Sequence, residues 1–129
     1  MRIITVLYNE ETENLIMFNR KPTLTFPCIH TNYEEKSVSA ALRLLNDLGV
    51  TECAEKDIVF LYRNTAVGRK HIDSENTYEV YFVSIRSYHS DKLIEMSPRY
   101  DFSCNTVRDF VIMGQVLSYI DDIGSKISG

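Results

Sequence analysis

The chain has 129 residues and a mass of 14.9 kDa, a size that is typical of one domain. Hydrophobic residues make up 44% and charged residues 25% of the sequence, which excludes disordered and collagen-like chains. Eighteen acidic and fourteen basic residues give a net charge of -4, which disfavours a nucleic-acid backbone as the main partner. We therefore predict a single globular domain over residues 1–129.

The cysteines and the apolar runs indicate a compartment. Cys28, Cys53 and Cys104 cannot all pair within one chain, and none forms the CxxC pair that would indicate a zinc site. No signal peptide is recognisable, and no apolar run approaches the ~20 residues of a membrane helix. These features predict reduced thiols, a cytoplasmic location and no membrane partner.

The first half of the chain changes its hydrophobic period once. β-Branched and apolar runs predict strands at Arg2–Tyr8 and Leu15–Phe18, and the polar link between them indicates a hairpin. A short edge strand is predicted at Thr23–Phe26, because prolines bound it on both sides. Helical spacing of apolar residues then predicts a helix over Ser37–Leu48, with Gly49 in the C-cap position.

The second half is predicted to hold two strands and a helix. The strands are Asp57–Arg63 and Thr77–Ser87, with the polar stretch Asn64–Asn76 between them as a long loop. A helix begins near Val107, and its tail at Ser125–Gly129 is expected to fray. Because strict βαβ alternation is absent, this order predicts an α/β (α+β) fold with a mixed sheet.

The segment Cys28–Val50 resembles the Nudix box. The pattern of that box is a glycine, five residues, a glutamate, seven residues, and then Arg-Glu-apolar-x-Glu-Glu-x-Gly-apolar. The resemblance implies a Nudix-like αβα sandwich with a mixed sheet. It also implies the chemistry of that family, the Mg²⁺-assisted hydrolysis of a pyrophosphate, for a chain that keeps the glutamates of the box.

Two registers relate this chain to the box. Without gaps, Glu34 matches the first glutamate and Gly49 the final glycine, while Arg43 stands at the glutamate that follows the box arginine. Asn46 and Asp47 replace the glutamate pair. A one-residue deletion in the helix gives a second register, in which Arg43 is the box arginine and leucines occupy two glutamate positions. Asp47 is the helix carboxylate that both registers keep.

The replacements predict a degraded catalytic box. Mg²⁺ prefers octahedral oxygen ligands, and glutamates at i, i+3 and i+4 bring several carboxylates onto one helix face. Here that face carries the cation Arg43 and the neutral amide of Asn46, so weak metal affinity is expected. Glu34 and Asp47 are the candidate catalytic and metal-binding residues, and Mg²⁺ is expected as a cofactor only of an active enzyme.

Basic side chains are candidates for binding a phosphorylated ligand by charge-assisted hydrogen bonds. They are Arg43 on the box helix and, in the predicted loop, Arg69, Lys70 and His71, with Arg63 beside it. Solvated loop charge is the alternative for the loop residues. For Arg43 the alternative is a helix ion pair with the residue four positions later, Asp47.

Structural roles remain as alternatives for several other residues. Glu34 fits a helix-capping box with Thr31, since the two stand in an S/T-x-x-E pattern. The strand tyrosines suit base stacking, but also the packing of a core or a dimer face; they are Tyr62, Tyr78, Tyr81 and Tyr88. A Cys28–His30 nucleophile and base has no supporting signature around it.

The sequence thus predicts a Nudix-like domain that binds a nucleotide-like or phosphorylated small molecule, or a protein partner, with little hydrolysis. The alternative is a divergent Nudix hydrolase that cleaves nucleoside diphosphate-linked substrates with Mg²⁺. A third interpretation is an interaction module that uses the fold as a scaffold. A homodimer is left open, and a nucleic-acid partner is not expected.

Overall fold

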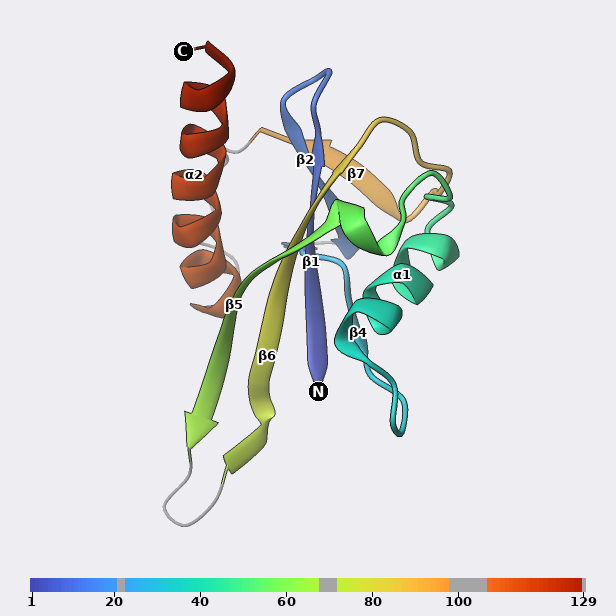
Figure 1. The fold of residues 1–129 in the computed structure, drawn as a ribbon, viewed down its shortest axis with the longest axis vertical. Helices are drawn as coiled ribbons and strands as arrows, with labels where there is room; N and C mark the ends of the chain where they lie inside the picture. Colours follow the sequence, from blue (N-terminus) through green and yellow to red (C-terminus); the bar gives the residue numbers. More distant parts are fainter. Residues whose placement is uncertain (21–22, 68–71, 98–106, 129) are drawn as a thin grey trace.

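A computed structural model describes residues 1–20, 23–67, 72–97 and 107–128 of the chain. Within these ranges, seven strands, two α-helices and one 3₁₀ turn follow in chain order (Figure 1). They are β1 (Arg2–Asn9), β2 (Asn14–Arg20), β3 (Thr23–Thr25), β4 (Cys28–His30), α1 (Ser37–Asp47), η1 (Glu55–Asp57), β5 (Ile58–Val67), β6 (Ile72–Ile85), β7 (Leu93–Met96) and α2 (Val107–Ser128).

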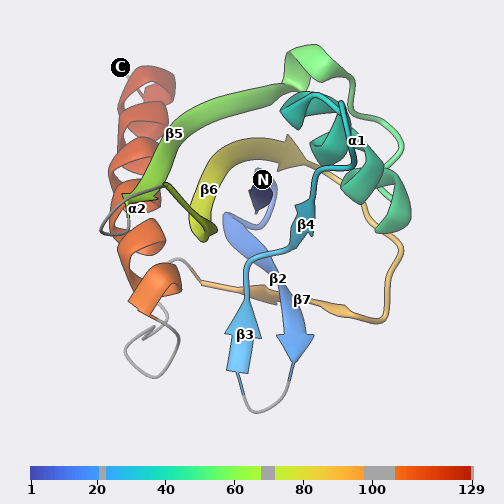
Figure 2. The same ribbon diagram turned by 90° about the horizontal axis from the view of Figure 1, so that it is seen from below.

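The strands form one mixed sheet, as the sequence predicts. Its path runs β3-β2-β1-β6-β5, with β4 paired to β1 and β7 paired to β2. β1 and β6 are parallel, in a register that runs from Arg2 opposite Tyr78 to Asn9 opposite Ile85, and the other pairs are antiparallel. Figure 2 shows the strong curvature of β5 and β6 around the centre of the sheet.

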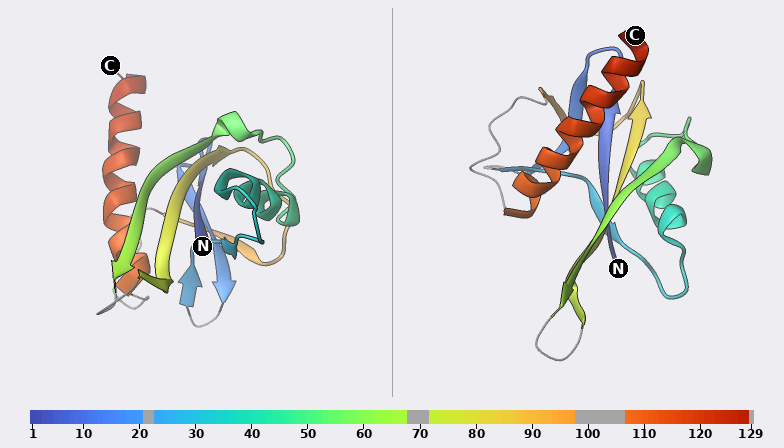
Figure 3. Two further views of the ribbon diagram at one scale, coloured as in Figure 1. Left: turned by 60° about the horizontal axis from the view of Figure 1, so that its bottom comes forward. Right: turned by 60° about the vertical axis from the view of Figure 1, so that its left-hand side comes forward.

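The two helices cover opposite faces of this sheet (Figure 3). Alternation along β6 divides its side chains between the two faces. Tyr81, Val83 and Ile85 pack with α1 residues such as Leu45, while the alternate side chains pack with α2 residues, Ile112, Met113 and Val116. The expected αβα sandwich with a mixed sheet is therefore confirmed.

β1 lies between both hydrophobic clusters, so its side chains are buried on either face. Ile3, Ile4, Val6 and Leu7 all have 0% exposure. Thr5 is equally buried, and its hydroxyl is satisfied because it donates a hydrogen bond to the carbonyl of Pro27 at 3.0 Å. β1 is thus the central strand of the core.

Several predicted boundaries are wrong. β5 continues to Val67 and β6 begins at Ile72, so most of the predicted loop at Asn64–Asn76 is strand. The ladder pairs Asn64 with Tyr78 and Ala66 with Asp73, and such backbone pairing tolerates polar side chains.

Two short strands and one helix end also differ from the prediction. β4 and β7 were not predicted, because runs of three and four residues carry little periodicity. The predicted edge strand at Thr23–Phe26 ends at Thr25. α2 continues through the expected fray to Ser128. Among the described residues, no helix is long and apolar enough to cross a membrane.

Gly49 ends α1 with a positive φ of 77°, as its predicted C-cap role requires. A Cβ added there would lie 2.7 Å from the backbone oxygen of His89. We expect Gly49→Ala to lower the free energy of unfolding by about 2 kcal/mol, from backbone strain and this contact. Urea denaturation measures the change.

Gly114→Ala is the matched control, since it makes the same chemical change in α2, where nothing lies within 4 Å of the added methyl group. It should raise stability by about 0.5–1 kcal/mol, the helix-propensity difference between the two residues. Equal effects of the two substitutions would contradict the close approach of α1 to His89.

Candidate functional site

The turn before α1 uses different residues from those predicted. The backbone N–H of Glu35 donates to the carbonyl of Asn32 at 3.0 Å, and the Glu35 carboxylate accepts the N–H of Asn32 at 2.9 Å. Glu34 stands in this turn with a φ of 61° and is exposed. The capping box predicted for Thr31 and Glu34 is therefore wrong, because the reciprocal pair is one residue further along.

Arg43 holds this turn against α1. Its Nε and Nη2 donate to the two carboxylate oxygens of Glu35 at 3.1 and 2.9 Å, and Nη2 also donates to the carbonyl of His30 at 2.8 Å. The salt bridge of Arg43 is thus with Glu35, and none with Asp47 is found among the described residues. The fork is bidentate, which fixes the geometry of both side chains.

The electrostatics of this pair follow from its contacts. The hydrogen bond from Arg43 lowers the pKa of Glu35 below its ordinary value of 4.5. The same hydrogen bond raises the pKa of Arg43. Glu35 retains 16% and Arg43 35% side-chain exposure, so the pair lies at the surface and part of the Arg43 guanidinium stays accessible.

Glu35 was missed by the sequence analysis, although a signal existed. Seven residues separate Glu35 from Arg43, which is the spacing between the first glutamate and the arginine of the box. The ion pair therefore favours the second register for this part. From Arg43 to Gly49 the chain is one residue shorter than the box.

The second register explains what α1 lacks. The glutamate positions of the box fall on Leu44, Asp47 and Leu48. Leu44 and Leu48 are 5% and 4% exposed and belong to the core cluster beneath α1. Asp47 is exposed at the end of the helix. A buried leucine offers no oxygen to a cation, so two positions of the ligand set contribute to the core instead.

The described residues do not fit a divalent metal ion. No group of three His, Cys, Asp or Glu side chains in the described ranges is arranged to hold one. Glu34 and Asp47, the candidate ligands, are not joined by a third carboxylate, and hard cations require several oxygen donors.

A second surface beside α1 combines an aromatic ring, a cation and a carboxylate. In the ladder of β5 and β6, Phe60 lies opposite Tyr81 and Arg63 opposite Glu79. Directly opposite residues share a face, and Glu79 and Tyr81 share one because they are two apart on β6. We call Phe60, Arg63, Glu79 and Tyr81 the ladder face.

A register shift creates the ladder face. Phe60 pairs with Tyr81 and Tyr62 with Val80, so Leu61 is an extra residue on β5. In a regular strand, residues three apart point to opposite faces, but one extra residue restores the parity. Phe60, which is 52% exposed, and the exposed Arg63 therefore lie on the same side as α1.

The ladder face is anchored to α1. The hydroxyl of Ser37, the first residue of α1, donates to Oε1 of Glu79, and the hydroxyl of Tyr81 lies 3.5 Å from the same oxygen. The rings of Phe60 and Tyr81 meet edge to face with centroids 5.5 Å apart. Burial raises the pKa of Tyr81 above its ordinary 10.0, so its hydroxyl keeps its proton at neutral pH.

The other predicted tyrosines serve the structure. Tyr62 and Tyr78 meet edge to face at 6.3 Å on the α2 side, and burial raises the pKa of Tyr62. The hydroxyl of Tyr88 donates to Glu95 of β7 at 3.1 Å. Arg69, Lys70 and His71, which were predicted to bind a phosphorylated ligand, lie outside the described residues.

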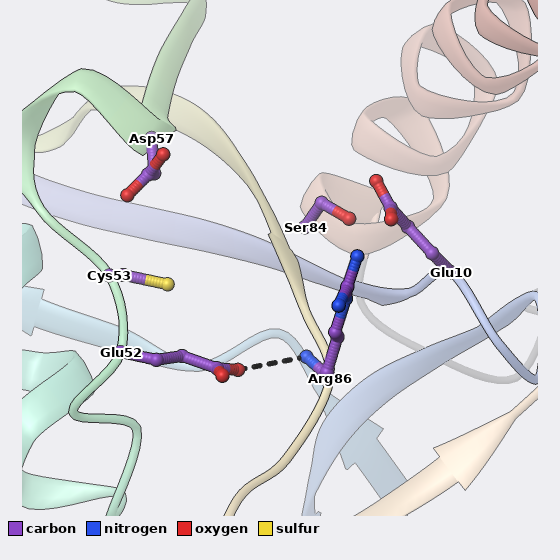
Figure 4. A pocket seen from close by; sticks show the side chains of 6 residues that line it. All are labelled: Glu10, Glu52, Cys53, Asp57, Ser84 and Arg86. Carbon is purple, nitrogen blue, oxygen red and sulfur yellow. Dashed lines mark hydrogen bonds between the residues drawn. The ribbon is translucent and has the colours of Figure 1, made fainter.

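An open hollow of about 330 Å³ lies at the carboxyl ends of β1 and β6 (Figure 4). Three carboxylates, one thiol, one hydroxyl and one guanidinium line it: Glu10, Glu52, Asp57, Cys53, Ser84 and Arg86. The excess of negative charge disfavours phosphate there. Burial, with Asp57 and Glu52 nearby, raises the pKa of the Cys53 thiol, which makes it a poor nucleophile.

The Glu35–Arg43 pair predicts a particular acid dependence of stability. Since the pKa of Glu35 is lowered below 4.5 by folding, the unfolded chain takes up the proton first. The contribution is fully present above the unfolded pKa and is lost as the pH falls through the folded one. Glu35→Gln should therefore flatten the acid limb of the free energy of unfolding against pH.

Denaturant titrations from pH 7 to pH 2 measure that limb. Glu34→Gln is the matched control, because it removes the neighbouring negative charge without touching the contacts of Arg43. An acid limb as steep in Glu35→Gln as in the unchanged protein would mean that the pair does not hold in solution.

Comparison with known proteins places the fold. Neither a protein-family model nor a curated protein sequence matches this chain. Among solved structures, a C. elegans Ap4A hydrolase in a binary complex has a TM-score of 0.66 and 9% identity, with 95% of this chain and 99% of that one covered.

Two further structures share the architecture. The NUDIX domain of Shewanella oneidensis NrtR, complexed with ADP ribose, has a TM-score of 0.57 and 10% identity over 92% of this chain and 86% of that one. A MutT/nudix family protein from Enterococcus faecalis has a TM-score of 0.55 and 16% identity. The match covers 73% of this chain and 42% of the length of the Enterococcus protein. The chain therefore has the Nudix-like fold that the resemblance of its box segment implied.

Proposed function

We propose that residues 1–129 form one Nudix-like domain that binds a nucleotide-like or phosphorylated ligand and hydrolyses it little or not at all. The observation that carries this proposal is the burial of Leu44 and Leu48 in the core at two glutamate positions of the box. The NrtR domain, whose structure holds ADP ribose, supports a ligand-binding role for the fold.

Hydrolysis is disfavoured on electrostatic grounds. Cleavage of a pyrophosphate needs cations held against the charge that develops on the phosphate oxygens. Beyond the buried leucines, the outer face of α1 offers the exposed side chains of Asn46 and Asp47. One carboxylate and one neutral amide do not supply the several oxygen ligands that a cation bridging two phosphates needs from the protein.

The ladder face carries the groups that suit a nucleotide. Phe60 presents a ring on which a base can stack, and base stacking on an aromatic side chain is worth about 1–3 kcal/mol. Arg63 lies two ladder pairs away, at the next position on the same face, and offers the forked donors that match a phosphate. In this proposal the remaining phosphate contacts come from Arg43, Arg69, Lys70 and His71.

The proposal keeps two alternatives as outcomes of its tests. A divergent hydrolase would use Glu34 and Asp47 with Mg²⁺ on a nucleoside diphosphate-linked substrate, and the fold of the Ap4A hydrolase favours it. A protein partner, including a second copy of this chain, would use the fold as a scaffold. We also propose a cytoplasmic location, supported by the free thiols of Cys28 and Cys53.

The first test is hydrolysis. Nucleoside triphosphates, dinucleoside polyphosphates and nucleotide sugars should release no phosphate or pyrophosphate above background with Mg²⁺ or Mn²⁺. Asp47→Ala is the control, since Asp47 is the helix carboxylate kept in both registers. Robust turnover that this substitution abolishes would establish the hydrolase alternative, whereas turnover that it leaves intact would indicate a contaminant or another site.

The second test is binding without metal. Calorimetry with Ap4A and ADP should show binding to the unchanged protein, and Phe60→Ala or Arg63→Ala should weaken it about tenfold or more. Val59→Ala is the matched control, because Val59 is 40% exposed on the same strand and pairs with Phe82 on the α2 side. It should leave affinity unchanged.

Each negative result has a defined meaning. Affinity that survives both Phe60→Ala and Arg63→Ala would place the ligand elsewhere than the ladder face. Failure of the unchanged protein to bind any nucleotide would overturn the ligand-binding role and favour the protein partner.

A further inference from the structure

We infer that Glu79 reads the base of the bound nucleotide and selects bases that carry an exocyclic amino group. The inference rests on the proposed function, because it assigns a recognition role within the ladder face. Its observations are the hydrogen bonds that hold one oxygen of the Glu79 carboxylate and the aromatic ring beside it.

The carboxylate of Glu79 is held by one of its two oxygens. Oε1 accepts the hydroxyl of Ser37 and lies within 3.5 Å of the hydroxyl of Tyr81. Among the described residues, the hydrogen bonds of Glu79 fall on Oε1. Glu79 is partly exposed, and in this inference Oε2 is the oxygen that meets the ligand.

The stacking ring and the acceptor belong to one rigid group. Tyr81 is 5% exposed, contacts Phe60 edge to face and places its hydroxyl at Glu79. In this inference, a base stacked on Phe60 meets the Glu79 carboxylate, which Ser37 holds and the Tyr81 hydroxyl approaches. Such preorganisation converts one hydrogen bond into selectivity, because no side chain has to be ordered when the ligand arrives.

The chemistry of the acceptor defines the ligand class. An ionised carboxylate only accepts hydrogen bonds, so it favours a base edge with an amino donor. Adenine and cytosine present such a donor, whereas uracil presents a carbonyl oxygen in its place, and so does hypoxanthine. A carbonyl oxygen placed against a carboxylate leaves both acceptors unsatisfied, which is costly at a partly buried site.

A purely structural role of Glu79 explains the contact of one carboxylate oxygen and not the use of the other. The hydrogen bond from Ser37 ties the start of α1 to β6, and this alone requires only Oε1. A glutamine would serve that purpose equally, since its carbonyl oxygen accepts the same hydroxyl. The second oxygen, and the aromatic ring beside it, are what the recognition role uses.

The test compares ligand pairs that differ in one group. Calorimetry without metal should show that ADP binds about tenfold or more tightly than inosine diphosphate, and CDP more tightly than UDP, as one hydrogen bond to a charged acceptor provides. In Glu79→Gln both ratios should fall to about one, because the amide can donate as well as accept. Glu10→Gln, which removes an equal charge in the hollow, should leave the ratios unchanged.

The outcomes separate this inference from the proposed function. Equal affinity for ADP and inosine diphosphate overturns the inference and leaves the ligand-binding role intact. The Glu79→Gln protein is first shown to be folded by its thermal melt. If it still prefers ADP, another group recognises the base, and this also overturns the inference. If none of the four nucleotides binds, the proposed function fails and the inference fails with it.

Discussion

The parallel pairing of β1 with β6 is the constraint on which the rest of the structure depends. Both strands are covered on two faces, so every residue along them is committed to the α1 side or the α2 side. This commitment places Glu79 and Tyr81 beside α1 and Tyr78 beside α2. The side of the sheet on which Glu79 and Tyr81 lie follows from the parity of β6.

Helix α1 combines a surface ion pair with a buried apolar face. Arg43 and Glu35 keep the contact between the helix and the preceding turn, while leucines fill the core at positions where the pattern has glutamates. Burial of each leucine contributes about 1.5–3 kcal/mol to stability, whereas a buried carboxylate without a cation would cost several. At these two buried positions of the described helix, leucine is therefore the stabilising side chain.

The sequence predicts the layers of this fold better than its site. The period change at Ser37 and the runs of β1, β2 and β6 identify long elements, because burial imposes periodicity on them. It does not predict β4 and β7, whose few residues leave no period to read. Glu35 was not predicted because the neighbouring Glu34 matches the ungapped box. Phe60 was not predicted because regular strand alternation would place Phe60 and Arg63 on opposite faces of the sheet.

The extra residue in β5 has a consequence for how this chain can change. Leu61 alone keeps Phe60 and Arg63 on one side of the sheet. Deleting either Leu61 or Tyr62 would keep both Phe60 and Arg63 and leave a regular ladder, yet turn the guanidinium toward α2. In related chains, the length of this strand would therefore be as informative about ligand binding as the identity of its side chains. A homologue that keeps the phenylalanine and the arginine but has one residue fewer between them would have a different surface.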